Sequence, residues 1–242
     1  MTRHAVITNE EDHLKFVVVS WRNIPLVSFN DPMLMLGVPK SVTAATGCDA
    51  FVQAIEPYVS VDHNPITDSQ CKEAIQLIQE ALPEAVANGQ NVEARTKMVE
   101  AEMLAGMAFN NANLGYVHAM AHQLGGQYDA PHGVCCALLL TTVEEYNLIA
   151  CPDRFAELAR IMGYDTTGLT TMQAAEKSID GMREMCKAVG IPSSIKAIGA
   201  KPEDFSLMAE NALKDGNAFS NPRKGTKQDI IDLYQKAYDG IY

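Results

Sequence analysis

Three of the chain's six histidines, His118, His122 and His132, lie close together in the segment HAMAHQLGGQYDAPHG. His118 and His122 are four residues apart, so in a helix they share one face. His132 follows after Gly125-Gly126, and Pro131 restricts the direction of the chain just before it. Three imidazoles that converge on one point form a candidate site for a divalent metal. Core or surface histidines are the alternative, which the spacing alone leaves open.

A carboxylate that could complete such a site is Asp49, in the apolar segment TAATGCDAFVQAIEPY. An unpaired carboxylate is costly in apolar surroundings, so we expect Asp49 to face a cation or several hydrogen-bond donors. A helix-capping aspartate is the alternative. Gln53 lies one helical turn further along the same face, where glutamate or histidine would be a more usual metal ligand.

The segments that must position these side chains are predicted to be helical. Asn64 as N-cap and Pro65 as first helical residue predict a helix that Pro83 kinks or ends. Residues 114–126 predict a helix that ends at Gly125-Gly126, and residues 132–149 are apolar nearly all round, which predicts a central buried helix. Further amphipathic helices are predicted at 93–112, 152–163, 171–190, 202–216 and 226–238, the last with Thr226 as N-cap.

The first thirty residues differ from the rest because they are rich in β-branched and aromatic residues. HAVIT and KFVVVSW, separated by the polar NEEDH, predict a β-hairpin, and IPLVSFN predicts a third strand. Two or three strands are marginally stable alone, so we expect pairing strands to be missing. An unpaired sheet edge invites association, which makes a homo-oligomer the expected state.

Composition excludes several other classes. With a net charge of −11 and no long run of Lys or Arg, the chain is not expected to bind nucleic acid. It lacks both an apolar stretch long enough to span a membrane and a signal-peptide pattern, so we expect a cytoplasmic protein. The six cysteines form no CxxC pair and are expected to be reduced and mostly buried. His4, His13 and His63 are predicted to lie on the surface.

Five segments in the same order, PKSVTAATGCDA, NPITD, AGMAFNNANLGYVHAMAHQLGG, APHGV and ALKDGNAFSNPRKG, resemble the iron-containing alcohol dehydrogenases. Within that family, the chain resembles the branch of the 1,3-propanediol and lactaldehyde dehydrogenases, over essentially its whole length. The resemblance implies a mainly α fold, the dehydroquinate synthase-like helical C-terminal domain, preceded by a short β segment left from a truncated α/β domain. We therefore expect residues 1–36 to be the hairpin and strand remnant of a nucleotide-binding domain and residues 37–242 to be the helical metal-binding domain.

The resemblance also implies a metal site. The family holds a divalent metal with one aspartate and three histidines, whose positions here are Asp49, Gln53, His118 and His132. Gln53 replaces a histidine ligand, and an amide oxygen is a weaker ligand than imidazole, so we expect weakened rather than absent binding of Fe²⁺ or Zn²⁺. The remaining carboxylate and two imidazoles are still a recognised Fe(II) set.

Three further positions match the family's cofactor and substrate region. His122 matches a residue that helps proton movement beside the nicotinamide, Phe109 an aromatic that lines the pocket, and Lys15 a position near the cofactor ribose. The family's glycine-rich phosphate loop has no counterpart in the 242 residues. NAD(H) is expected from the resemblance, although its binding surface is largely missing.

The implied activity is NAD(H)-linked oxidation of a small primary alcohol or diol, or reduction of its aldehyde, with the metal polarising the substrate oxygen and His122 moving the proton. The alternative is a catalytically inactive truncated remnant or a metal-binding helical oligomerisation module, favoured by Gln53 and the missing loop. A helical metal phosphohydrolase is disfavoured because the chain contains Asp-His twice but no His-Asp pair.

Overall fold

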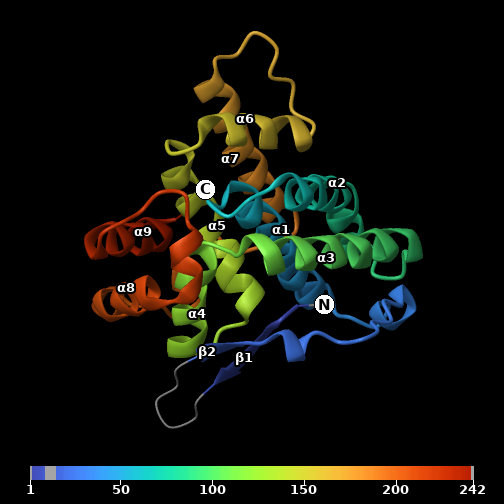
Figure 1. Cartoon of the computed structure of the whole chain (residues 1–242), viewed down its shortest axis with the longest axis horizontal. Helices are drawn as coiled ribbons and strands as arrows, with labels where there is room; N and C mark the ends of the chain where they lie inside the picture. Colours follow the sequence, from blue (N-terminus) through green and yellow to red (C-terminus); the bar gives the residue numbers. More distant parts are fainter. Residues whose placement is uncertain (1, 9–14, 241–242) are drawn as a thin grey trace.

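A computed structural model describes residues 2–8 and 15–240. This part of the chain is mainly α-helical, with one small antiparallel sheet at its edge (Figure 1). The elements are β1 (His4–Thr8), β2 (Lys15–Val19), α1 (Lys40–Val59), α2 (Pro65–Ala87), α3 (Val92–Ala112), α4 (Tyr116–Tyr128), α5 (His132–Leu148), α6 (Pro152–Ile161), α7 (Thr171–Ala188), α8 (Phe205–Lys214) and α9 (Lys227–Asp239).

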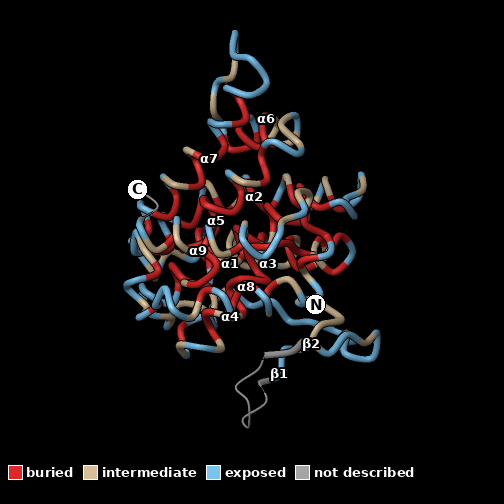
Figure 2. Tube along the Cα trace, turned by 90° about the vertical axis from the view of Figure 1, so that its left-hand side faces the viewer, coloured by how far each residue is buried: buried red, intermediate tan, exposed pale blue. Residues whose placement is uncertain are grey.

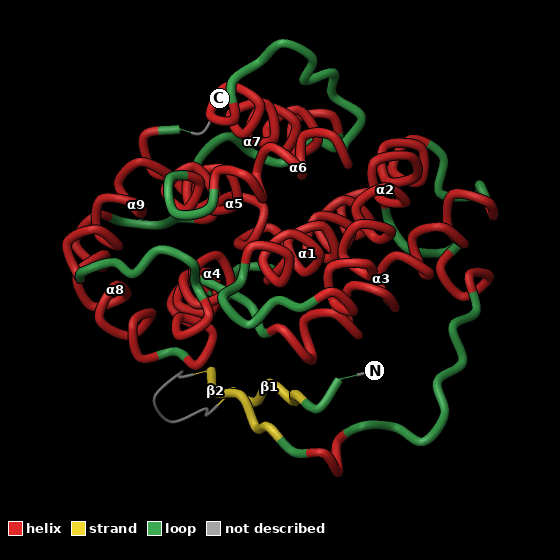
Figure 3. Tube along the Cα trace, turned by 45° about the horizontal axis from the view of Figure 1, so that its top comes forward, coloured by secondary structure: helices red, strands yellow, loops and turns green. Residues whose placement is uncertain are grey.

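Helices α1 and α5 form the centre of the bundle. Helix α1 packs against α2, α3 and α5, and α5 also contacts α4, α7 and α9 (Figure 3). Thirteen of the 17 residues of α5 are buried, which confirms the prediction of a central helix, and the buried parts of the trace gather around these helices (Figure 2). Helices α6 and α7 pack on each other at the end of the molecule away from β1 and β2 (Figure 1).

Helix α2 begins as predicted but ends later. The Asn64 side chain accepts hydrogen bonds from the backbone N–H groups of Ile66 and Thr67. The sequence predicts that Pro83 kinks or ends this helix. The helix does not end there, because it continues to Ala87. Proline removes one backbone hydrogen bond, but Ala85 and Val86 beyond it are buried, and their packing holds the last turn in place.

Helix α4 also runs further than the sequence predicted. It passes through Gly125-Gly126 and ends at Tyr128, before Asp129 in a left-handed conformation with φ 50°. Leu124 and Gly125 are buried, so core packing outweighs the low helix propensity of the glycines. Aspartate tolerates the left-handed conformation better than most residues, which lets Asp129 stop the helix.

The N-terminal segment forms the predicted hairpin but not the third strand. Strands β1 and β2 pair antiparallel, with His4 opposite Val19 and Thr8 opposite Lys15, while the connecting NEEDH lies outside the described residues. Residues 24–30 run as an irregular segment, so the predicted strand there is wrong. Within the described ranges no strand is available to pair with it, and Leu26 and Phe29 are almost fully exposed.

Other expectations have mixed outcomes. Thr226 caps α9 as predicted. All six cysteines are free in the described structure, and five are buried.

No helix in the described ranges is long and apolar enough to cross a membrane. His63 is exposed as predicted and His13 is not described, but His4, the first residue of β1, is half-buried and lines a cavity, so its surface prediction is wrong.

Candidate metal centre

Four side chains from three helices converge on one point. Asp49 comes from α1, His118 from α4, and His132 and Cys136 from α5, and one ligand atom of each lies within 4.8 Å of the others. The structure thus brings together the carboxylate and two histidines proposed from the sequence, and adds a thiol that sequence reasoning missed.

The polar atoms at this point lack ordinary partners. Asp49 Oδ1 lies 3.6 Å from His118 Nε2 and 3.5 Å from His132 Nε2, at or beyond the usual limit of a hydrogen bond. Within the described structure, Asp49 Oδ1 and His118 Nε2 are buried without a hydrogen-bond partner. Buried polar atoms without partners are costly, and a divalent metal between them would satisfy both. The residues therefore fit a metal.

Glu56 fixes the orientation of His118. Its buried carboxylate lies 2.6 Å from His118 Nδ1 and accepts a hydrogen bond of 2.7 Å from the backbone N–H of Val117. A carboxylate at this nitrogen keeps a proton on Nδ1, so Nε2, which faces Asp49, is the ring nitrogen that would bind a metal. Burial opposes the charged imidazole, yet the acidic groups of Cys136, Glu56 and Asp49 hold the pKa of His118 well above its usual value.

Gln53 lies beside Asp49, as its position one turn along the same helix face predicted. Its Nε2 donates a hydrogen bond of 3.0 Å to Asp49 Oδ2. A carboxylate oxygen only accepts hydrogen bonds, so the amide atom next to it must be the nitrogen. Burial alone would raise the pKa of Asp49, but the nearby rings of His118 and His132 hold it below its usual value.

His122 is oriented by a second carboxylate. Its ring lies 6.3 Å from that of His118 and 5.4 Å from that of His132, between centroids. Its Nδ1 lies 2.7 Å from Asp215 Oδ2, which leaves Nε2 as the other ring nitrogen for proton exchange. Burial would raise the pKa of Asp215, but the contact with His122 holds it below the usual value.

A cavity of about 150 Å³ lies next to the histidines. The three histidines, Gln53 and Phe109 line it. The hairpin covers this cavity with His4, whose ring is 5.9 Å from that of Phe109. The volume suits a molecule of a few non-hydrogen atoms.

Glycines allow the helices to approach closely enough to form the site. A Cβ on Gly133 would lie 2.1 Å from the backbone oxygen of Ala45, so only glycine lets the start of α5 reach α1. This contact brings His132, the residue just before it, to Asp49. A Cβ on Gly115 would likewise lie 2.8 Å from the carboxylate of Glu56.

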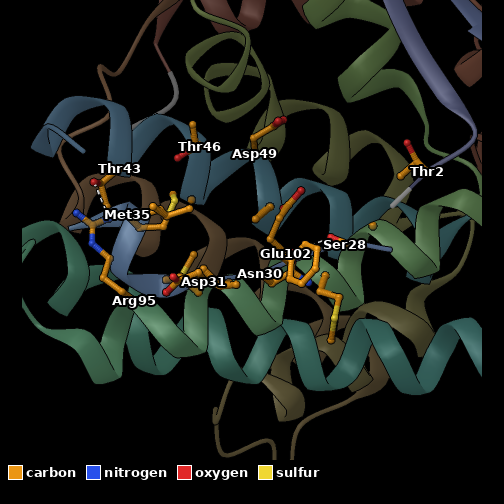
Figure 4. A pocket seen from close by; sticks show the side chains of 18 residues that line it. Thr2, Ser28, Asn30, Asp31, Met35, Thr43, Thr46, Asp49, Arg95 and Glu102 are labelled. Carbon is orange, nitrogen blue, oxygen red and sulfur yellow. Dashed lines mark hydrogen bonds between the residues drawn. The ribbon is translucent and has the colours of Figure 1, made fainter. Parts of the chain in front are cut away.

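A larger cavity of about 490 Å³ opens on the other side of Asp49, between α1, α3 and residues 28–35 (Figure 4). Glu102 faces it near Asp49, while Arg95 donates a hydrogen bond of 2.9 Å to Thr43 at the opposite end (Figure 4). We place the chemistry at the smaller cavity, because the histidines line that one. The Lys15 side chain, predicted near a cofactor, lies outside the described structure.

Sequence reasoning missed Cys136, Glu56 and Asp215. Cys136 follows His132 by four residues, and Glu56 follows Asp49 by seven, so helical spacing places each pair on one face and could have revealed both. Asp215 lies in the segment ALKDGNAFSNPRKG, and nothing in its local sequence indicates that it reaches His122.

Comparison with known proteins gives the family. Residues 43–238 match the model of the Fe-containing alcohol dehydrogenase family, C-terminal. The chain is 57% identical over 238 residues to the 1,3-propanediol dehydrogenase of Klebsiella pneumoniae and 38% identical to the lactaldehyde reductase of Escherichia coli K12, covering 98% of itself and 62% of each relative.

The solved structures agree. The alcohol dehydrogenase from Oenococcus oeni is 80% identical with a TM-score of 0.96, again over 98% of this chain and 62% of that one. The chain thus spans about 62% of the length of these relatives. The family model covers most of the chain and the helical fold matches, so the chain belongs to the iron-containing alcohol dehydrogenase family.

Proposed function

We propose that this chain carries the metal centre and substrate pocket of an NAD(H)-linked dehydrogenase for a small primary alcohol or diol, which in reverse reduces the corresponding aldehyde. The observation that carries the proposal is the convergence of Asp49, His118 and His132, with two buried atoms that have no partner among the described residues. Relatives named 1,3-propanediol dehydrogenase and lactaldehyde reductase support the substrate class.

In this proposal Asp49, His118 and His132 hold Fe²⁺ or Zn²⁺, and Glu56 orients the His118 ring. When bound, the metal supplies Lewis-acid polarisation of the substrate oxygen, and NAD(H) accepts or supplies the hydride.

His122 has the geometry of a proton carrier. Asp215 binds its Nδ1, so Nε2 can take the hydroxyl proton of an alcohol in the cavity or return it to the oxygen of an aldehyde. Phe109 and the hairpin residues His4, Val6 and Val17 line the same cavity. Its volume of about 150 Å³ favours small substrates.

The decisive experiment follows NADH absorbance while the purified chain, loaded anaerobically with Fe²⁺, is offered 3-hydroxypropionaldehyde. We expect NADH oxidation in the wild-type chain and none in His118→Ala, which lacks a metal ligand. A parallel metal titration of both proteins separates loss of metal from loss of turnover. Wild-type oxidation no faster than that of His118→Ala would contradict the dehydrogenase proposal.

One observation favours a second candidate, a metal-binding helical module without turnover. Gln53 stands where the family has a histidine ligand, and its amide nitrogen is turned to Asp49. Metal binding in the titration without NADH oxidation would support this candidate.

A further inference from the structure

Cys136 lies inside the candidate metal centre. It is fully buried on α5, one helical turn after His132, and its Sγ is 3.6 Å from His132 Nε2. Its Sγ also lies within 4.8 Å of the ligand atoms of Asp49 and His118. The His118 Nε2 is buried and has no hydrogen-bond partner in the described structure, which is a second and independent sign that a metal ion binds here.

The separations fit coordination of one ion. Two ligand atoms about 2.0–2.3 Å from a tetrahedral metal lie roughly 3.3–3.7 Å apart. The measured distances are 3.5 Å from Asp49 Oδ1 to His132 Nε2, 3.6 Å from Asp49 Oδ1 to His118 Nε2, and 3.6 Å from Cys136 Sγ to His132 Nε2. All three lie in this range.

Gln53 is the weaker candidate for the fourth position. Its amide nitrogen donates to Asp49 Oδ2, so only its Oε1, which is buried without a partner among the described residues, could bind a metal. A neutral amide oxygen is a weaker donor than a thiolate, so a nearby thiol is the stronger candidate for the donor that the family takes from histidine.

We propose that Cys136 is the fourth metal ligand of this chain, in place of the histidine that Gln53 replaces. The inference rests on the proposed three-residue site and adds to it. On binding, the Sγ–H bond breaks, the proton leaves to solvent, and an Sγ–metal bond forms without any oxidation or reduction.

A sulfur donor changes which metal the site prefers. Thiolate is a softer ligand than imidazole. Replacing one of three imidazoles with a thiolate therefore increases the preference of the site for Zn²⁺ and Co²⁺ over Fe²⁺. The chain is therefore expected to select zinc from an equimolar mixture of Fe²⁺ and Zn²⁺.

Cobalt tests the proposal directly, because a thiolate bound to Co²⁺ gives a charge-transfer band in the near ultraviolet that imidazole and carboxylate ligands do not give. The full chain is titrated anaerobically with Co²⁺, beside Cys136→Ala and the control Cys135→Ala, which removes an equally buried neighbour outside the cluster. We expect the band in the wild-type chain and in Cys135→Ala, its loss in Cys136→Ala, and at least about tenfold weaker binding in that variant.

The double variant Gln53→His/Cys136→Ala should recover the affinity without the band and should bind Fe²⁺ better relative to Zn²⁺. If Cys136→Ala does not fold by circular dichroism, Cys136→Ser replaces it. Stoichiometric cobalt binding by the wild-type chain without the band overturns the role of Cys136 and leaves the three-residue site standing. Failure of the wild-type chain to bind cobalt overturns both proposals.

Discussion

At the scale of single residues, Glu56 supports the candidate metal centre without being one of its ligands. Its carboxylate holds His118 Nδ1 at 2.6 Å, and a neutral amide there would weaken that hold. We expect Glu56→Gln to lower metal affinity by about 10- to 100-fold, measured by competition with a chelator. Glu144→Gln, another fully buried glutamate without a histidine contact, is the control and should leave the affinity unchanged. Equal losses in both variants would contradict this role.

Glu144 makes its own contribution to pH dependence. Burial, with the nearby Glu56, raises the pKa of Glu144 to about 8. The Glu144 carboxyl loses its proton near pH 4.5 in the unfolded chain and near pH 8 in the folded chain. Its contribution to folding stability is therefore fully present below pH 4.5 and is lost as the pH rises to about 8. The maximum slope is about 1.4 kcal/mol per pH unit. Urea unfolding should therefore show a smaller loss of stability between pH 5 and pH 8 in Glu144→Gln than in the wild-type chain, and parallel curves would refute this.

The residues found and missed by sequence reasoning differ in the range of their contacts. Asp49, His118 and His132 belong to long recognisable segments, so they could be predicted. Cys136 lies in the apolar segment HGVCCALLL, and its closeness to Asp49 and His118 is visible only where α5 meets α1 and α4. Asp215 reaches His122 from 93 residues away, a distance at which local pattern carries no information.

At the scale of elements, the close contact of α1 and α5 is the feature that assembles the site. Gly133→Ala would place its Cβ against the backbone of Ala45, so the helices must separate and carry His132 away from Asp49. We expect a loss of about 1–3 kcal/mol in unfolding free energy, together with weaker metal binding. Gly37→Ala, where no described atom would lie within 4 Å of the new Cβ, should change stability by less than about 0.5 kcal/mol.

Helix periodicity predicted these elements well and their ends less well. The sequence displays several local features directly: the apolar spacing of α2 and α9, the nearly uniform apolarity of α5, and the caps Asn64 and Thr226. Pro83 and Gly125-Gly126 are local breakers that buried neighbours override. The strand predicted at 24–30 failed for the opposite reason, because β-propensity needs a pairing strand and the described structure offers none there.

At the scale of the whole molecule, the N-terminal segment exposes an unusual amount of apolar surface. Among the described residues, ten large exposed hydrophobic side chains lie between positions 6 and 34, and nine lie in all the rest. Leu26 is 102% exposed and Phe29 is 89% exposed. Exposed apolar side chains in such number favour association, and the short β1–β2 sheet adds unpaired edges in the same segment.

We therefore expect the purified chain to sediment as an oligomer, with the N-terminal segment inside the interface. The double variant Leu26→Ser/Phe29→Ser removes two of the largest exposed side chains without touching the buried core, so it should shift the mass toward the monomer in sedimentation velocity at equal concentration. Ile66→Ser, on the exposed start of α2, is the matched control and should leave the oligomer intact. A wild-type chain that sediments as a monomer, or an oligomer that Leu26→Ser/Phe29→Ser leaves unchanged, would place the association surface elsewhere and leave the apolar N-terminal segment without that role.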